Sequence, residues 1–170
     1  MPYIQPATNN IFGLQPVEGI PGDGQTGLYM VSSSEAVPIL PGDAIVRSSI
    51  GTVRSAVTAD VTQFIGSAAQ ALTTAEFAQG TLNLLVYDDP TQYYVITNAS
   101  SANITLLNLG QNHAIITSAT GVGIPSALVG RSKMALGANT ASSAGLVRLV
   151  GQHPVEVWSS NPAGAFKWIV

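Results

Sequence analysis

Residues 82–97 read LNLLVYDDPTQYYVIT, and this stretch indicates the fold class of the chain most directly. Two apolar runs that contain Val, Ile and Tyr, Leu82–Tyr87 and Tyr93–Thr97, are typical of strands. Between them stands Asp88-Asp89-Pro90, a turn signal in which Asp side chains bind nearby backbone N–H groups. The sequence therefore predicts a β-hairpin over these residues.

Similar short runs extend on both sides of this stretch, from residue 44 to the C-terminus, with Gly, Asn and Pro between them. They are residues 44–50, 52–57, 103–107, 114–118, 133–136, 146–150 and 166–170. Many short β-rich runs at close spacing predict an all-β body over residues 44–170. We expect a β-sandwich or barrel of short antiparallel strands.

Residues 61–72 fit two descriptions. Their apolar residues recur at helical spacing, and Asp60 is a suitable N-cap. Gly66 interrupts the run, and glycine costs about 1 kcal/mol in a helix interior. The pattern by itself leaves helix and strand open.

Residues 1–43 differ in composition from the rest. They hold six of the ten prolines and the turn-rich run 21–27. Proline fixes φ and lacks a backbone N–H, so neither a regular helix nor a central strand is expected. The large apolar side chains there exceed what a disordered tail carries. We predict an extended Pro-rich N-terminal arm that lies on its own body, on a neighbouring subunit or on a lattice; the alternative is an irregular start packed on its own domain.

The candidate interface residues come mainly from this arm. Trp158, in a loop-like stretch near the C-terminus, is a further candidate, either as an exposed anchor or as a packed residue. The full set is Tyr3, Ile4, Ile11, Phe12, Leu14, Leu28, Tyr29 and Trp158.

Charged residues are scarce. They make up 9% of the chain, against roughly 25% in an ordinary soluble domain. A free monomer usually keeps many surface charges for solubility, so we expect much of this surface to be buried against copies or partners. The alternative is a soluble domain with a Ser, Thr and Asn surface. The six basic residues are scattered, which predicts no nucleic-acid partner, and the charge-free stretch 91–130 is too often interrupted by polar residues for a membrane span.

No residue pattern predicts catalysis, a cofactor or a metal. Asp88 and Asp89 are adjacent and would point to opposite faces of a strand, and His113 and His153 are the only histidines. Each histidine is expected to be a surface residue or one satisfied by hydrogen bonds. There is no cysteine, which excludes a thiolate metal site. We expect a protein that is not an enzyme, and no signal peptide is visible in the opening residues.

Six short motifs follow one another in the order found in a family of phage structural proteins. They are residues 41–46 (PGDAIV), 64–69 (FIGSAA), 84–95 (LLVYDDP, then YYV), 108–112 (NLGQN), 130–136 (GRS, then MAL) and 146–151 (LVRLVG). Over residues 41–170 the chain thereby resembles the head decoration or cement proteins that tailed bacteriophages encode beside the major capsid protein. In that family the second motif is a strand, which favours a strand at 64–69.

This resemblance implies a structural virion protein that binds the outside of a capsid lattice. The implied partners are the major capsid protein and copies of the chain itself, as a homotrimer, with no catalytic residue and no cofactor. The implied location is the surface of the phage head, after synthesis in the host cytoplasm. The alternative is a phage tail, fibre or adhesin-type β-rich binding module that presents exposed aromatic side chains to glycans.

Overall fold

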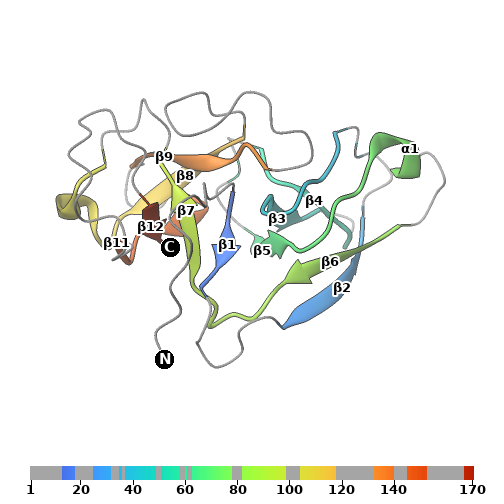
Figure 1. Cartoon of the computed structure of the whole chain (residues 1–170), viewed down its shortest axis with the longest axis horizontal. Coiled ribbons are helices and arrows are strands. Elements are labelled where there is room, and N and C mark those ends of the chain that lie inside the picture. The colour runs from blue at the N-terminus through green and yellow to red at the C-terminus, as the bar shows by residue number, and fades with distance from the viewer. Residues whose placement is uncertain are drawn as a thin grey trace, which may run out of the picture.

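Short antiparallel strands make up almost all of the regular structure in the computed structural model, so the all-β prediction is confirmed (Figure 1). The structure describes residues 13–17, 25–31, 35, 37–48, 51–57, 60, 63–77, 82–98, 104–117, 132–139, 145–152 and 167–170. Within these ranges the strands form two lobes, each around its own apolar core.

The first lobe is a five-stranded sheet in the order β2–β6–β5–β3–β4. Its strands are β2 (Thr26–Met30), β3 (Ala44–Arg47), β4 (Val53–Ser55), β5 (Phe64–Ala68) and β6 (Asn83–Tyr87), and the short helix α1 (Thr74–Phe77) links β5 to β6. Val31, directly after β2, makes a parallel bridge to Val53 in β4, so the two edges of the sheet meet. The strands enclose a core of Val31, Ile39, Ile45, Val53, Ala68, Leu72, Leu84 and Val86.

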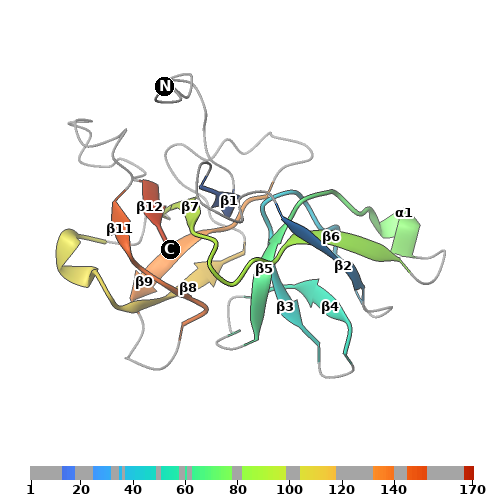
Figure 2. The same ribbon diagram turned by 90° about the horizontal axis from the view of Figure 1, so that it is seen from below.

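The second lobe combines a four-stranded and a three-stranded sheet, in the orders β1–β7–β12–β11 and β10–β8–β9. The strands are β1 (Gln15–Pro16), β7 (Tyr94–Thr97), β8 (Asn112–Ile116), β9 (Ala135–Asn139), β10 (Val147–Arg148), β11 (Gly151–Gln152) and β12 (Lys167–Ile169). Asn98, after β7, bridges Leu136 in β9, and β10 leads directly into β11, so the two sheets are joined. Figure 2 shows the two lobes side by side.

Strand β3 is the wall between the two cores. Side chains alternate along a strand, and here Ala44 and Val46 enter the larger core, whereas Ile45 enters the core of the first lobe. All three are at most 1% exposed. A run that is buried on both faces reads as continuously apolar, which explains why residues 44–46 show no polar alternation.

A tight turn before β3 binds both lobes. The backbone N–H of Asp43 donates to the Leu40 carbonyl (2.9 Å), with Pro41 and Gly42 (φ 91°) at the positions that a type II turn reserves for them. The Gly42 carbonyl accepts from Leu14 N–H (2.7 Å), and its N–H donates to Ala68 in β5 (2.9 Å). The turn therefore fixes an N-terminal segment and a first-lobe strand to the same residue, Gly42.

The predicted hairpin over residues 82–97 is wrong, because its two strands belong to different lobes. β6 is hydrogen-bonded to β2 on one side and β5 on the other, which leaves it no free edge for β7. β7 pairs instead with β1 and β12. The turn between them is real, since Gln92 N–H donates to the Asp89 carbonyl (3.0 Å), but it carries the chain from one lobe to the other.

Two further local expectations have clear outcomes. The strand at 64–69 is confirmed as β5, and the helix alternative fails there. The strand predicted at 103–107 is wrong over the described residues 104–107, since a 3₁₀ helix, η1, occupies Leu106–Asn108. Thr105 and Asn108 cap each other's backbone across this turn, and that local bonding competes with strand pairing.

The described part of residues 1–43 packs on its own chain. β1 and β2 are strands of the two lobes, and Leu14 and Ile39 are fully buried. Both strands lie at sheet edges, as expected for a segment with this many prolines. Residues 1–12, 18–24, 32–34 and 36 lie outside the described ranges, and for them the arm stays a prediction.

Gly66 tests the pairing of β5 with β6. A Cβ at this position would stand 1.7 Å from the Tyr87 carbonyl oxygen, a backbone atom that cannot move without separating the strands. We expect Gly66→Ala to lower the free energy of unfolding by at least about 3 kcal/mol in urea denaturation. Gly151→Ala is the matched control, since nothing lies within 4 Å of its added Cβ, and it should stay within about 1 kcal/mol of the native chain. Equal effects of the two substitutions would contradict the pairing.

Asp43 tests the junction of the lobes through pH. Its carboxylate is 6% exposed, accepts from Leu40 N–H (2.8 Å) and binds Ser132, and burial raises its pKa to about 6. The folded state therefore binds the proton more tightly than the unfolded state, and this group's contribution to stability falls as pH rises from about 4 to 6, by roughly 3 kcal/mol at most. Asp43→Asn keeps an acceptor for Leu40 but cannot ionise. We expect its stability relative to the native chain to rise over that pH window in urea titrations, whereas a constant difference would contradict the buried acid.

Candidate functional site

Exposed apolar side chains gather at two places on the described surface. Ten large apolar residues there are classed as exposed, and six of them form two groups. One group lies on β2 and β6 of the first lobe, and the other lies on η1 of the second lobe. These two groups are the candidate functional surfaces.

The first group follows from the strand register. Leu28 stands opposite Leu85, and Met30 stands opposite Asn83, so these side chains share one face of the sheet. Further along the same sheet, this face carries Ala44, Val46 and Phe64, which pack against the larger core. The second lobe thus covers one half of the face and leaves the other half open. We call the open half, made of Thr26, Leu28, Met30, Asn83 and Leu85, the β2–β6 surface.

The β2–β6 surface contains no charged residue, and its apolar side chains are well exposed. Leu28 is 65% exposed and Met30 51%. Tyr29 points to the other face, where its hydroxyl donates to the Asp88 carboxylate (2.6 Å). This hydrogen bond raises the pKa of Tyr29 and ties β2 to the end of β6. The surface is therefore backed by a fixed strand pair.

The second group is a protruding turn of three leucines. Leu106, Leu107 and Leu109 are 60%, 90% and 43% exposed, and we call this group the leucine turn. Ile104, just before it, is buried in the larger core and anchors it to the second lobe. A leucine with nine-tenths of its surface in water contributes little to the stability of its own chain.

Hydrogen bonds hold the leucine turn in one shape. Thr105 N–H donates to the Asn108 side chain (2.8 Å), and Leu107 N–H donates to the Thr105 hydroxyl (3.3 Å). Beyond the turn, Gly110 takes φ 79° and bonds to residues at the end of β10. Its N–H donates to the Leu149 carbonyl (2.8 Å), and its own carbonyl accepts from the Arg148 guanidinium (3.1 Å). The exposed leucines are thus presented on a rigid support.

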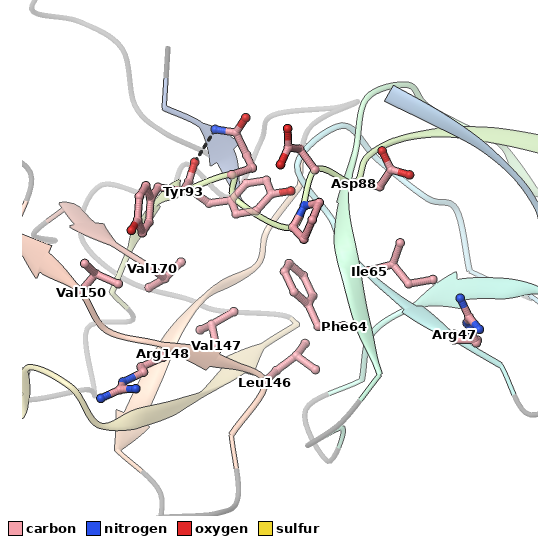
Figure 3. Close-up of a pocket in the computed structure, with 14 residues that line it drawn as sticks. Arg47, Phe64, Ile65, Asp88, Tyr93, Leu146, Val147, Arg148, Val150 and Val170 are labelled. Carbon is pink, nitrogen blue, oxygen red and sulfur yellow. Dashed lines mark hydrogen bonds between the residues drawn. The ribbon is translucent and has the colours of Figure 1, made fainter. Parts of the chain in front are cut away.

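A groove of about 550 Å³ lies where the two lobes meet (Figure 3). Phe64, Tyr93 and Leu146 surround its centre, and Arg47 and Arg148 lie on opposite sides. Its volume falls in the range of small-ligand sites. We call it the interlobe groove.

Most polar side chains of the interlobe groove already hold hydrogen bonds within the chain. Asp89 accepts from the Thr91 N–H (2.7 Å) and hydroxyl (2.6 Å), and these bonds lower the pKa of its carboxyl. The Gln92 amide donates to the Val17 and Tyr93 carbonyls. The Tyr94 hydroxyl donates to the Tyr87 carbonyl (2.6 Å), and burial raises its pKa far above the usual value. These groups stabilise the corner between the lobes, and the groove offers a ligand chiefly apolar walls.

The predicted interface residues separate into three kinds. Leu28 lies on the β2–β6 surface, Tyr29 is half-buried beside it, and Leu14 is fully buried in the larger core. The others, Tyr3, Ile4, Ile11, Phe12 and Trp158, lie outside the described residues. Sequence reasoning missed Met30, Leu85 and the leucine turn. A signal for the turn was present, because residues 105–110 (TLLNLG) combine three leucines with the capping pair Thr105 and Asn108 and a glycine, inside a charge-free stretch.

His113, Asp88 and Asp89 form hydrogen bonds within the chain. His113 is fully buried, with Nδ1 3.0 Å from the Gly137 carbonyl, rather than at the surface. Asp89 accepts local hydrogen bonds from Thr91, as expected of a turn, whereas Asp88 accepts from Tyr29 on β2. Among the described residues, no three His, Cys, Asp or Glu side chains are grouped so as to hold a metal ion. No helix within the same ranges has the length and apolar character to cross a membrane.

Comparison with known proteins gives no match: no protein-family model, no curated protein and no solved structure corresponds to this chain.

Two substitutions separate the support of the leucine turn from its exposed face. Asn108→Ala removes the acceptor for Thr105 N–H and should lower the free energy of unfolding by about 1 kcal/mol. Leu107→Ala truncates a side chain that is 90% exposed and should leave stability unchanged. Urea denaturation of both variants checks this contrast. A larger loss for Leu107→Ala would mean that this leucine packs within its own chain.

Proposed function

We propose that this chain is a non-enzymatic structural protein of a tailed-phage head, which binds the outside of the capsid lattice and cements or decorates it. The observation that carries the proposal is the pair of uncharged apolar surfaces, the β2–β6 surface and the leucine turn, exposed on a chain with only 9% charged residues. The order of the six sequence motifs supports the same assignment.

Exposed apolar surface of this kind favours a bound state. Burial of apolar area contributes about 25 cal/mol per Å², and soluble monomers rarely leave contiguous apolar patches open. Few charges surround these surfaces to keep separate molecules apart. A protein with such surfaces is expected to function while bound to copies of itself or to partners.

Binding surfaces that are held in one shape suit a protein that adds contacts to a lattice. The β2–β6 surface is backed by paired strands, and the leucine turn is held by capping and strand bonds. Preformed surfaces lose little conformational freedom on binding, which favours affinity. On a symmetric lattice one modest contact is repeated many times, and linked contacts give avidity without chemistry.

The proposal names two partners, the major capsid protein and further copies of the chain, with a homotrimer as the expected assembly. It places the protein on the phage head after synthesis in the host cytoplasm. It includes no cofactor, no nucleic acid and no membrane.

Fractionation of virions tests this assignment. Heads and tails are separated on density gradients and analysed by mass spectrometry, and the chain is expected with the heads, in a fixed ratio to the major capsid protein. Heads that lack the chain should bind the purified protein saturably and then withstand heating better, because added contacts stabilise only the assembled state. Recovery with tails would instead support the fibre or adhesin alternative, and absence from both fractions would reject a virion role.

A further inference from the structure

Charge is divided between the two halves of the chain. Residues 1–90 hold eight acidic and two basic residues, a net charge of −6, and residues 91–170 hold one acidic and four basic residues, a net charge of +3, which together give the overall −3. The fold keeps this division. Among the described residues, the first lobe carries Glu35, Asp43, Arg47, Arg54, Asp60, Glu76, Asp88 and Asp89, and the second lobe carries Lys133, Arg148 and Lys167.

The lobe that bears the β2–β6 surface is acidic, and the lobe that bears the leucine turn is basic. Within the first lobe, Arg54 and Asp60 neutralise each other (2.7 Å). Glu76 lies on α1, before β6 in the chain, and Asp88 and Asp89 follow β6; Asp88 accepts from Tyr29 on the face opposite the β2–β6 surface. On the second lobe, Arg148 adjoins the leucine turn and donates to Gly110 at its end. The β2–β6 surface thus belongs to the acidic lobe, and a basic residue adjoins the leucine turn.

The two surfaces also differ in shape and place. The β2–β6 surface is one side of a strand pair, whereas the leucine turn projects from a 3₁₀ helix. Figure 1 shows β2 and β6 toward one end of the molecule and the yellow coil of the leucine turn at the other. One chain therefore cannot cover its own apolar surface with its own turn, but a second copy can.

We infer that the leucine turn of one copy docks on the β2–β6 surface of a second copy, head to tail. Leu107 is the central anchor, since it is 90% exposed and faces Leu28, Met30 and Leu85 of the other copy in this arrangement. Arg148 approaches the acidic lobe of the other copy, which sets the orientation of the contact and excludes the reverse one. The contact joins two different surfaces, so it closes into a ring or continues as a chain.

This inference deepens the proposed function and rests on it for its biological setting, because it names the surfaces through which copies meet. It assigns to the two apolar surfaces the contact between copies, which is one of the two partner contacts that the proposed function names. A protein that meets its copies in this way can link neighbouring positions of a lattice.

Complementation between two variants tests the head-to-tail contact. Leu107→Asp spoils the turn and Leu28→Asp spoils the β2–β6 surface, and each leaves the other surface intact. Light scattering of the purified full chain over a concentration series should give an oligomer for the native protein and a monomer for each variant. An equal mixture of the variants should reach the mass of a dimer, since one intact turn meets one intact surface. Val37→Asp, at a residue that is 62% exposed and outside both surfaces, is the matched control and should remain oligomeric.

Several outcomes would overturn the inference. These are a monomeric native chain, a Leu28→Asp variant that still forms the native oligomer, or a mixture no heavier than its separate components. Circular dichroism of each variant shows whether the fold is retained, and the exposure of both leucines predicts that it is. Binding of the purified chain to heads is measured separately, so a failed head-to-tail contact and a failed virion role give different results.

Discussion

The turn at Leu40–Asp43 is the constraint on which the arrangement of both lobes depends. Three of its backbone groups bind Leu14, Ala68 and Ser132, which come from three separate parts of the chain. Directly after it, β3 sends alternate side chains into the two cores. The angle at which the chain leaves this turn therefore fixes which face of the five-stranded sheet meets the second lobe. A polar, buried carboxylate at Asp43 completes the turn by accepting from Leu40.

The exposed apolar surface is a consequence of that same register. One sheet face runs from β3 and β5, where it is covered, across β6 to β2, where it is open. Side chains alternate between the two faces of a sheet with a period of two. Leu28, Met30 and Leu85 therefore lie on the face that the second lobe covers at β3 and β5, but beyond the part that it covers. The chain keeps leucine and methionine there, at a position where an ordinary soluble domain would carry charge. The leucine turn likewise exposes leucines on the other lobe, where an ordinary soluble domain would carry charge.

Apolar area and charge then act together. The apolar side chains supply the tendency to associate, which has no direction of its own. The division of charge between the lobes supplies direction, because an acidic lobe and a basic lobe attract when copies lie head to tail and repel when like ends meet. The proposed contact between copies rests on this combination.

The sequence by itself determined the fold class and the scarcity of charge, because both depend on local propensity or composition. The pattern at 61–72 left helix and strand open, and only the resemblance favoured the strand that is found at β5. Proline excluded a central strand from residues 1–43 but did not predict the edge strands β1 and β2. The sequence could not determine which strands pair. Residues 82–97 carry every local signal of a hairpin, yet β6 already has a partner on each side, and those partners come from residues far away in the chain. The place of Leu14 in a core and of Leu28 at a surface was equally undecided, since both are leucines in a proline-rich segment. Only the tertiary structure decides such cases, because burial depends on what the rest of the chain brings to each face.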